Sequence, residues 1–299
     1  MPAADRVLDL STTPAFVSVR NEQLVIRPKE GPETSLPLAE VAMVVLGGRH
    51  ATLTQPVLAG LAEVNAGVVI GGDNHQPVAM LLPTQANTLA TQRLRQQIAI
   101  TEPRRKRLWQ SVVVAKIKAQ ARLLAELDLE HQAVRALADR VKSGDPNNVE
   151  ATAAQRYWPL LMGPAFRRRF DHPGANGLLN YGYAVLRAAM SRAICAAGLH
   201  PALGIHHRGR GNAFCLADDL MEPYRPLVDG VAHAIVGADG PDTSLGPRQK
   251  KQLIEGVMQR LEHDAEWRGS GEWFAKTAGS ILDDGNTRRP TVFYPRGIL

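Results

Sequence analysis

The hydrophobic pattern of the chain changes from strand-like to helical near residue 85, and this change limits the possible folds more than any other feature. Before it, short runs of β-branched residues alternate with turn residues. After it, Ala, Leu, Gln, Arg and Lys recur with helical spacing. We predict an α+β protein with a small β-sheet domain over residues 1–84 and a larger all-helical domain over residues 85–299. With 44% hydrophobic residues in 299 positions, both parts can bury a core.

The N-terminal part is expected to form one small sheet with a single helix. The expected strands are 16–20, 23–27, 41–46, 68–70 and 77–82, and the expected helix is 55–65. Asn21 and Glu22 separate the first two strands as a two-residue turn. Pro56 lies near the first position of the helix, where a missing N–H costs nothing.

The C-terminal part is expected to contain a series of helices around one buried helix over 176–198, which is apolar on nearly every side. The other expected helices are 84–102, 103–127, 130–142, one that Asn147 or Asn148 caps and that contains Glu150, 220–236, 246–267 and 271–282. The tail after Asp284 is expected to be irregular.

Positive charge is concentrated in the C-terminal part. The whole chain carries +6, but residues 1–84 hold 5 Lys and Arg against 8 Asp and Glu, so the remainder holds 30 against 21. The resulting net charge of +9 is expected for a domain that contacts phosphates, although a basic run can also be a solvated helix face. The candidate phosphate contacts are residues 104–107 and 167–169, Arg208, Arg210, Arg248, Lys250 and Lys251.

The cellular compartment follows from what the sequence lacks. Cys195 and Cys215 lie in unrelated contexts, so neither a disulfide framework nor a Cys-x-x-Cys metal site is expected. No run approaches the ~20 apolar residues that cross a bilayer. We therefore expect a cytoplasmic protein without membrane association.

Three segments contain residues that could carry chemistry. Glu150 lies in the first turn of its expected helix, where it either ligates a metal or only complements the helix dipole. His206 and His207 lie in a Gly-rich loop with Arg208 and Arg210, which is either a phosphate-binding loop or an exposed loop with incidental histidines.

The third segment is acidic and follows closely on the paired histidines. It contains Asp218, Asp219 and Glu222, and the spacing of the last two places them on one helix face. The same spacing is typical of a capping box. Taken together, the three segments offer two or three carboxylates and one imidazole, a ligand set that suits Mg²⁺ or Mn²⁺ better than Zn²⁺. Such an ion could polarise a phosphodiester.

These residues resemble the CRISPR-associated spacer-acquisition integrases, the Cas-one endonucleases. The resemblance is carried by Glu150 with Ala153, Tyr157 and Trp158, by residues 203–207 about 57 positions later, and by the segment 218–226. The connector 212–216 is similar to the branch found beside single-protein effector nucleases, the type II systems.

The resemblance implies a metal-dependent DNA integrase and endonuclease for antiviral defence. It would join the 3′ ends of short foreign DNA, the spacers, to a repeat of the CRISPR array by transesterification. Glu150, His207 and Glu222 would be the catalytic metal ligands for Mg²⁺ or Mn²⁺. His207 is preferred to His206 because the family's histidine lies three positions after the glycine, here Gly204. Asp219 would be a further ligand or a supporting group.

The implied partners are double-stranded DNA and other proteins. The family forms two dimers bridged by a dimer of the small Cas-two protein, a hetero-hexamer in which one active site per dimer joins DNA. The β domain would supply the homodimer contacts. The effector nuclease of the same system is a further candidate partner.

Two other functions are compatible with the residues alone. The chain could be a DNA-binding scaffold whose acidic groups only cap helices, in which case its DNA binding would be indifferent to chelators. It could also be a metal hydrolase of small phosphate esters, but no Gly-rich loop between a strand and a helix is present to hold a phosphate.

Overall fold

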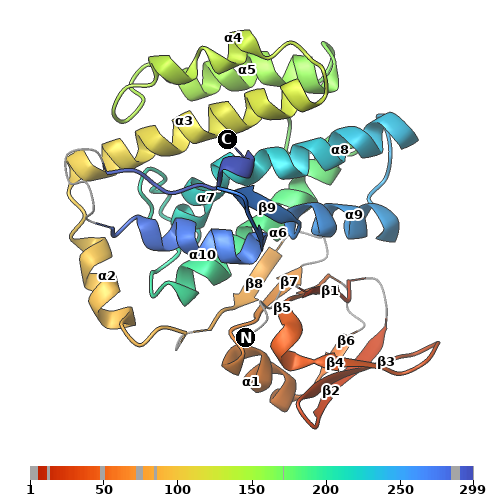
Figure 1. Ribbon diagram of the computed structural model, residues 1–299. Helices are drawn as coiled ribbons and strands as arrows, with labels where there is room; N and C mark the ends of the chain where they lie inside the picture. The colour runs from red at the N-terminus through yellow and green to blue at the C-terminus, as the bar shows by residue number, and fades with distance from the viewer. Residues whose placement is uncertain are drawn as a thin grey trace.

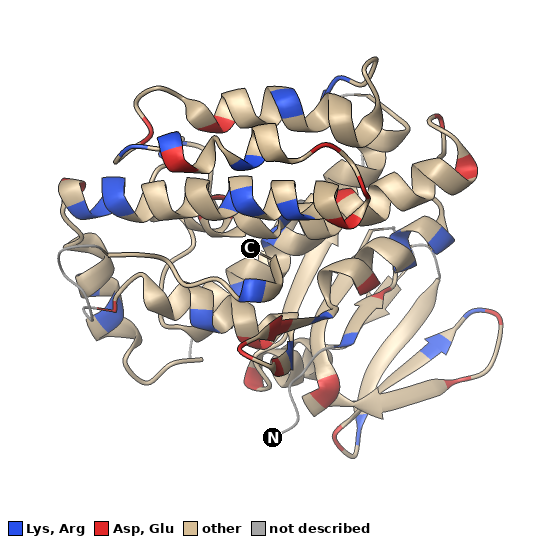
Figure 2. Cartoon of the chain, turned by 45° about the horizontal axis from the view of Figure 1, so that its top comes forward, with Lys and Arg blue, Asp and Glu red and all other residues tan. Residues whose placement is uncertain are grey.

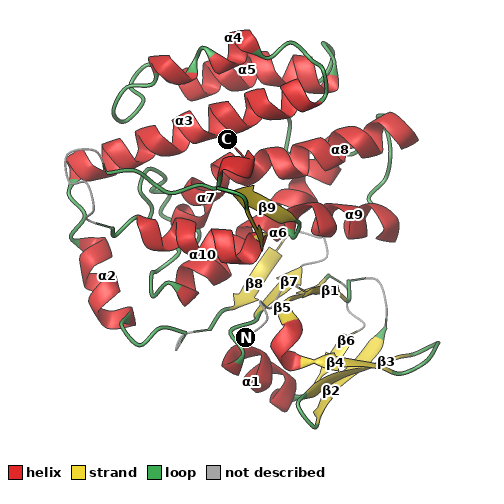
Figure 3. Cartoon of the chain, viewed as in Figure 1, coloured by secondary structure: helices red, strands yellow, loops and turns green. Residues whose placement is uncertain are grey.

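The computed structural model describes residues 6–11, 14–47, 51–71, 77–83, 86–170, 172–283 and 290–298. Strands dominate the N-terminal part and helices the remainder (Figures 1 and 3), so the predicted α+β class is confirmed. The predicted domain boundary falls on residue 84, which lies outside the described residues together with residue 85. The division into two domains at that point stays a prediction.

The N-terminal part contains two four-stranded sheets among its described residues, so the expectation of a single sheet was wrong. The first sheet has the order β1 (Arg6–Asp9), β5 (Val41–Leu46), β7 (Gly67–Gly71), β8 (Pro77–Leu81). The second has the order β4 (Thr34–Pro37), β3 (Gln23–Pro28), β2 (Ala15–Arg20), β6 (Ala51–Leu53). The strands missed from sequence, β1, β4 and β6, are three or four residues long, too short for an alternating pattern to be recognised.

The β2–β3 hairpin forms as predicted. Arg20 pairs with Gln23, and Asn21 and Glu22 between them have φ angles of 51° and 59°. Positive φ at both central residues is the conformation of a type I′ turn, whose twist matches that of the strands. The predicted helix is α1 (Gln55–Glu63).

Strand β5 is apolar on both faces because it separates two cores. Val44 belongs to the core between the sheets and α1, whereas Met43 and Val45 belong to the core of the helical part. Since consecutive side chains of a strand point to opposite faces, one strand serves both cores. The first sheet therefore packs directly against the helices, as Figure 1 shows.

Helices of the C-terminal part surround α6 (Ala175–Ala196), the buried helix that the sequence predicts. The other helices are α2 (Ala90–Ile98), α3 (Glu102–Glu126), α4 (Gln132–Arg135), α5 (Val149–Met162), α7 (Cys215–Met221), α8 (Arg225–Asp239), α9 (Pro247–Val257) and α10 (Ser270–Ser280). Short 3-10 turns are η1 (Leu38–Glu40), η2 (Ala138–Arg140), η3 (Glu222–Tyr224) and η4 (Arg296–Ile298). Helices α7, α8, α9 and α10 contact α6, and α3 lies against η3.

Three of the expected helices are interrupted. The helix expected over 246–267 ends at Val257, and a hairpin of β9 (Arg260–His263) and β10 (Glu266–Gly269) follows, so the helical part is not entirely helical. Its turn contains Asp264 and Ala265 at positive φ, which a helix cannot contain. The helix expected over 220–236 is divided by η3, where Pro223 lacks a backbone N–H. The helix expected over 130–142 consists of only α4 and η2.

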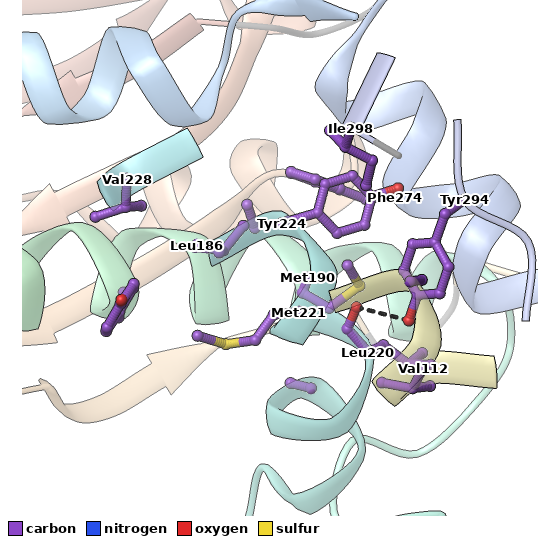
Figure 4. Packing of buried hydrophobic residues seen from close by; sticks show 14 of the residues in the cluster. Val112, Leu186, Met190, Leu220, Met221, Tyr224, Val228, Phe274, Tyr294 and Ile298 are labelled. Atoms are coloured by element: carbon purple, nitrogen blue, oxygen red, sulfur yellow. Dashed lines mark hydrogen bonds between the residues drawn. The ribbon is translucent and has the colours of Figure 1, made fainter. Parts of the chain in front are cut away.

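The C-terminal segment 290–298 runs back across α3 and η3. The Val292 N–H donates to Ser111 Oγ at 2.9 Å, and Tyr294 Oη donates to the Leu220 carbonyl at 3.2 Å. The Tyr294 ring packs against Tyr224, with the ring centroids 5.6 Å apart (Figure 4). The predicted irregular tail after Asp284 lies outside the described residues over 284–289. Its described part is irregular apart from η4 and belongs to the core around η3.

Candidate active site

Glu150 is fixed at the start of α5 by a carboxylate upstream of the helix. Asp145 accepts the N–H groups of Val149 at 2.9 Å and Glu150 at 3.0 Å, so it satisfies two of the free donors at this helix end. Asn148 occupies the cap position, as one of the two sequence alternatives stated, but its side chain makes no cap hydrogen bond. The capping contact therefore comes from Asp145.

Asp219 holds the loop that carries the paired histidines. Its side chain is fully buried, and its carboxylate accepts the backbone N–H groups of Ile205 at 2.6 Å, His206 at 2.9 Å and His207 at 3.1 Å. Because α7 already begins at Cys215, Asp219 lies inside a helix and caps none, so the capping-box interpretation was wrong. Asp219 acts as a supporting group for the loop.

Gly204 allows the loop to approach Asp219 this closely. A Cβ atom at this position would lie 2.4 Å from the His207 carbonyl oxygen and 2.9 Å from Asp219 Oδ2. Neither atom could give way without breaking the contacts that orient His207. Only glycine fits here.

The two histidines have different roles. His207 Nδ1 lies 2.6 Å from Asp219 Oδ1 and donates to it, so in the neutral imidazole the lone pair lies on Nε2. The hydrogen bond to Asp219 raises the pKa of His207 against the effect of burial, and the charge of Glu222 adds to this increase. His206 instead stacks on Trp109, with centroids 4.1 Å apart and an interplanar angle of 5°.

Glu222 meets Glu150 through a shared lysine. Lys116 Nζ, from α3, lies 2.5 Å from Glu150 Oε1 and 2.6 Å from Glu222 Oε2. Arg225 Nη2 lies 2.9 Å from the other oxygen of Glu222. Burial alone would raise the pKa of Glu222, but the charges of Arg225 and Lys116 outweigh it and lower this pKa to about 2. Glu222 is therefore ionised at every physiological pH.

A second buried network fixes Arg225. Its guanidinium lies over the Tyr183 ring, 4.4 Å from the centroid. The Tyr183 hydroxyl donates to Asp229 Oδ1, and the Tyr157 hydroxyl donates to Asp229 Oδ2 at 2.8 Å. Burial raises the pKa of Asp229 to about 6, although both tyrosine hydrogen bonds act to lower it.

The structure brings two of the three predicted ligands, Glu150 and Glu222, together on Lys116, and it does not group them with His207. Glu150 and Glu222 converge on one point, and His207 is close enough for Glu222 to raise its pKa. Within the described ranges, no three His, Cys, Asp or Glu side chains are grouped so that they could hold a metal ion. Glu222 Oε2 is buried and has no hydrogen-bond partner, and the free Nε2 of His207 is a suitable donor. These donors fit Mg²⁺ or Mn²⁺ in type, and their ligation of a metal stays a prediction.

A cleft of about 300 Å³ adjoins His207. Arg105 and Arg208 line it together with the loop residues Gly204 and Ile205. The cleft offers positive charge beside the histidine, which is a suitable arrangement for an anionic substrate.

Basic residues lie along α3 and on the surrounding helices (Figure 2), but several predicted phosphate contacts are engaged within the protein. Arg208 pairs with Glu102 at 2.6 Å, Arg248 pairs with Asp239, and Arg168 donates to Asn180. Lys250 is only 4% exposed and donates to Ser11, so it is excluded as a phosphate contact in this conformation. Lys251 is 76% exposed and remains a candidate.

Sequence reasoning missed Lys116 and Arg225. Lys116 lies in an apolar run, residues 112–117, where every other side chain is hydrophobic. A single charged residue in such a run signals a buried ionic partner, because an unpaired buried charge is very costly. Arg225 follows Glu222 at helical spacing, which is also visible in the sequence.

The helical part is basic, and it carries a buried carboxylate and a histidine that Asp219 holds in place. These features are typical of proteins that bind phosphodiesters and transfer phosphoryl groups. Residues 8–240 match the family model of the CRISPR associated protein Cas1. The chain is 37% identical over 247 residues to a CRISPR-associated endonuclease Cas1 of Neisseria meningitidis serogroup C, covering 82% of this chain and 81% of that protein. The chain belongs to the Cas1 family, as its motifs indicated.

Solved structures share the fold. A casposase bound to its integration product superimposes with a TM-score of 0.77 at 19% identity, covering 94% of this chain and 92% of the other. A Cas6-RT-Cas1–Cas2 complex gives 0.75 at 19% identity, covering 98% of this chain and 36% of that chain. A Cas1–DNA complex gives 0.56 at 19% identity, covering 84% and 83%. Among the described residues, no helix is both long and apolar enough to span a membrane.

Proposed function

We propose that this chain is a DNA integrase and endonuclease that inserts short foreign DNA into a CRISPR array. The proposal is carried by one observation: Glu150 and Glu222, 72 positions apart in the sequence, converge on a single cationic point near His207 in a chain of the Cas1 family. Two carboxylates and an imidazole would suit the divalent ion of a phosphoryl-transfer site that acts on a nucleic-acid backbone.

The reaction is a transesterification. The 3′-hydroxyl oxygen of the incoming DNA forms a bond to a phosphorus atom of the repeat, and the bond from that phosphorus to its 3′ oxygen breaks. The proton of the attacking hydroxyl leaves and a proton reaches the departing oxygen. One phosphodiester replaces another, so no energy source is needed. A bound Mg²⁺ or Mn²⁺ would polarise the phosphodiester and stabilise charge on the leaving oxygen.

The residues of the chain hold this site in order. Glu150, His207 and Glu222 would bind the ion. Asp219 keeps the proton of His207 on Nδ1 and turns Nε2 outward, and Arg225 positions Glu222. Arg105 and Arg208 line the adjoining cleft, where phosphate oxygens would compete with Glu102 for their guanidinium groups.

The proposed partners are double-stranded DNA and proteins of the same system. The excess of basic residues in positions 85–299 supports binding to a DNA backbone. The Cas1–DNA and Cas1–Cas2 structures that share this fold support partnership with DNA and with Cas2. We extend this to a homodimer, to two such dimers bridged by Cas2, and to the effector nuclease as a further partner.

Strand transfer in vitro tests the function. The protein, its Cas2 partner, Mn²⁺ and a labelled duplex with free 3′-hydroxyls are mixed with a supercoiled plasmid that carries the repeat. We expect half-site products, visible as labelled relaxed plasmid, and at least about 100-fold less product from Glu150→Gln, because loss of a ligand charge weakens the ion's binding and placement.

A matched control is Glu255→Gln, which removes the same charge from an exposed ion pair with Lys251 on α9. This variant should join DNA as well as the parent does. Equal joining by Glu150→Gln and Glu255→Gln would show that the carboxylate assignment is wrong.

A DNA-binding scaffold without chemistry is the second candidate, favoured by the position of Lys116 between the two carboxylates. In that case Lys116 neutralises both groups permanently, and DNA binding is unaffected by EDTA. Strand transfer that stops on addition of EDTA excludes this candidate.

A further inference from the structure

Lys116 occupies the point where a divalent ion would have to sit. Its ammonium contacts one oxygen of Glu150 and one of Glu222, at 2.5 Å and 2.6 Å. Its side chain is only 10% exposed, so water does not compensate its charge. The lysine is therefore a cation held by the two carboxylates.

The contact with Glu222 is a close approach of charges without a directed hydrogen bond. Lys116 donates to Glu150 Oε1, whereas Glu222 Oε2 lacks any hydrogen-bond partner among the described residues. A buried carboxylate oxygen without a donor is costly. The site thus satisfies its charge with Lys116 but leaves one acceptor oxygen open.

Two basic side chains already neutralise the two glutamates of the site. Glu150 and Glu222 face Lys116 and Arg225, so the four groups sum to zero. A divalent ion on the same carboxylate oxygens would lie within a few ångströms of the ammonium, where like charges repel strongly in a poorly hydrated site. Metal and Lys116 cannot both occupy this position.

We propose that Lys116 is a built-in counter-cation that holds Glu150 and Glu222 together before metal binds and competes with the divalent ion for them. The proposal rests on the proposed function, since it takes the two glutamates as metal ligands. It makes Lys116 a positioning residue that lowers the metal affinity of the free protein and keeps the metal-free site folded.

Metal binding to the DNA-free protein tests this directly. Free Mn²⁺ is followed by electron paramagnetic resonance during titration of the parent, Lys116→Met and Lys118→Met. Lys118 lies two positions further on the same helix and lines a different cleft, so its variant controls for the loss of one positive charge from α3. We expect Lys116→Met to bind Mn²⁺ at least tenfold more tightly than the parent, and Lys118→Met to match the parent.

Thermal unfolding supplies a second readout that does not depend on activity. In EDTA, Lys116→Met should melt below Lys118→Met, because Glu150 and Glu222 then repel each other without a counter-charge. Added Mn²⁺ should raise the melting temperature of Lys116→Met more than that of the parent. If Lys116→Met does not fold, Lys116→Gln takes its place. Its side chain is also neutral, and its amide group can still donate a hydrogen bond to Glu150.

The outcomes separate the two proposals. If Glu150→Gln abolishes Mn²⁺ binding but Lys116→Met binds no more tightly than the parent, the counter-cation is refuted and the proposed function stands. If neither the parent nor Lys116→Met binds Mn²⁺, the counter-cation is also refuted and the metal-dependent function fails with it. If Lys116→Met binds Mn²⁺ more tightly than the parent but the parent joins no DNA, the counter-cation proposal is supported and the proposed function is not.

Discussion

Asp229 is a buried carboxyl group that receives two tyrosine hydroxyls and lies near the charges of Arg225 and Lys116. Because Arg225 also pairs with Glu222, the protonation of Asp229 is linked to the charge around the candidate site. At the scale of single residues, the molecule thus positions its functional side chains through a second set of buried polar groups, which includes Asp145, Asp219 and Asp229.

The pH dependence of the free energy of unfolding should reveal the protonation of Asp229. Its folded pKa, about 6, lies above that of an unfolded Asp, ~3.9. The native state therefore favours the protonated form, and the stability this contributes is complete below the unfolded pKa and is lost as pH rises through about 6. Asp229→Asn stays neutral, so its free energy of unfolding relative to the parent should increase from about pH 4.5 to about pH 7.5 in urea titrations.

Asp239→Asn is the control for that measurement. Hydrogen bonds from Arg248 and Gln249 lower the pKa of Asp239, so this group is already ionised throughout the tested range. Its stability difference from the parent should stay constant. A constant difference for Asp229→Asn as well would contradict the assignment.

The sequence predicted the site at the residue scale only in part. Glu150, His207 and Glu222 stand out because their types and spacing match a family motif, and the two glutamates do meet across Lys116. Asp145 and Lys116 were missed because each acts across a turn or between helices. Such contacts depend on tertiary structure, which no local pattern of residues records.

Helix α6 packs unusually closely against α8. A Cβ atom on Gly182 would lie 2.3 Å from Val228 Cγ1, and Val228 is fully buried. At the scale of elements, this close approach sets the distance of α6 from α8, the helix that begins at Arg225 beside Glu222. The glycine therefore has a packing role within a helix.

Gly182→Ala should destabilise the protein by about 1–3 kcal/mol, because the added methyl group must displace buried Val228. Gly177→Ala on the same helix meets nothing within 4 Å and should stabilise it by about 0.5–1 kcal/mol, since alanine is the better helix former. Thermal unfolding of both variants measures the difference. Equal melting temperatures would mean that the helices can separate at no cost.

Helix positions were predicted better than helix ends. The periodicity of α3 and α6 extends over 25 and 22 residues and is unmistakable, whereas β9 and β10 have four residues each. The break at η3 depends on Pro223, which the predicted helix over 220–236 ignored. Whether a short segment forms a strand or a helix depends on its tertiary contacts. Strand β9, for example, packs against η4 in the C-terminal segment.

The whole molecule is asymmetric in charge, with an acidic β-rich part and a helical part of net +9. The two parts are joined by strand β5, whose two faces belong to different cores, and also by polar contacts. Lys250 Nζ donates to Ser11 Oγ at 2.9 Å, and the Tyr181 hydroxyl donates to Asp9 Oδ2 at 3.2 Å. We therefore expect DNA to bind on the helical part, away from the acidic sheets.

Salt dependence tests this expectation. Affinity for a duplex without a repeat should fall at least about tenfold between about 50 mM and about 200 mM salt, because bound phosphates release counterions. Lys251→Ala, which removes an exposed charge, should reduce the slope of the logarithmic plot, whereas Lys29→Ala in the β-rich part should not. Equal slopes for the two variants would contradict binding through the helical part.

The segment 290–298 has a consequence for how the protein is made. Its Tyr294 packs against Leu220 and Tyr224, the neighbours of Glu222, so this part of the core needs a segment that is synthesised well after Glu222. A nascent chain can assemble its sheets early, but we expect it to acquire an ordered carboxylate pair only after residues 290–298 have left the ribosome.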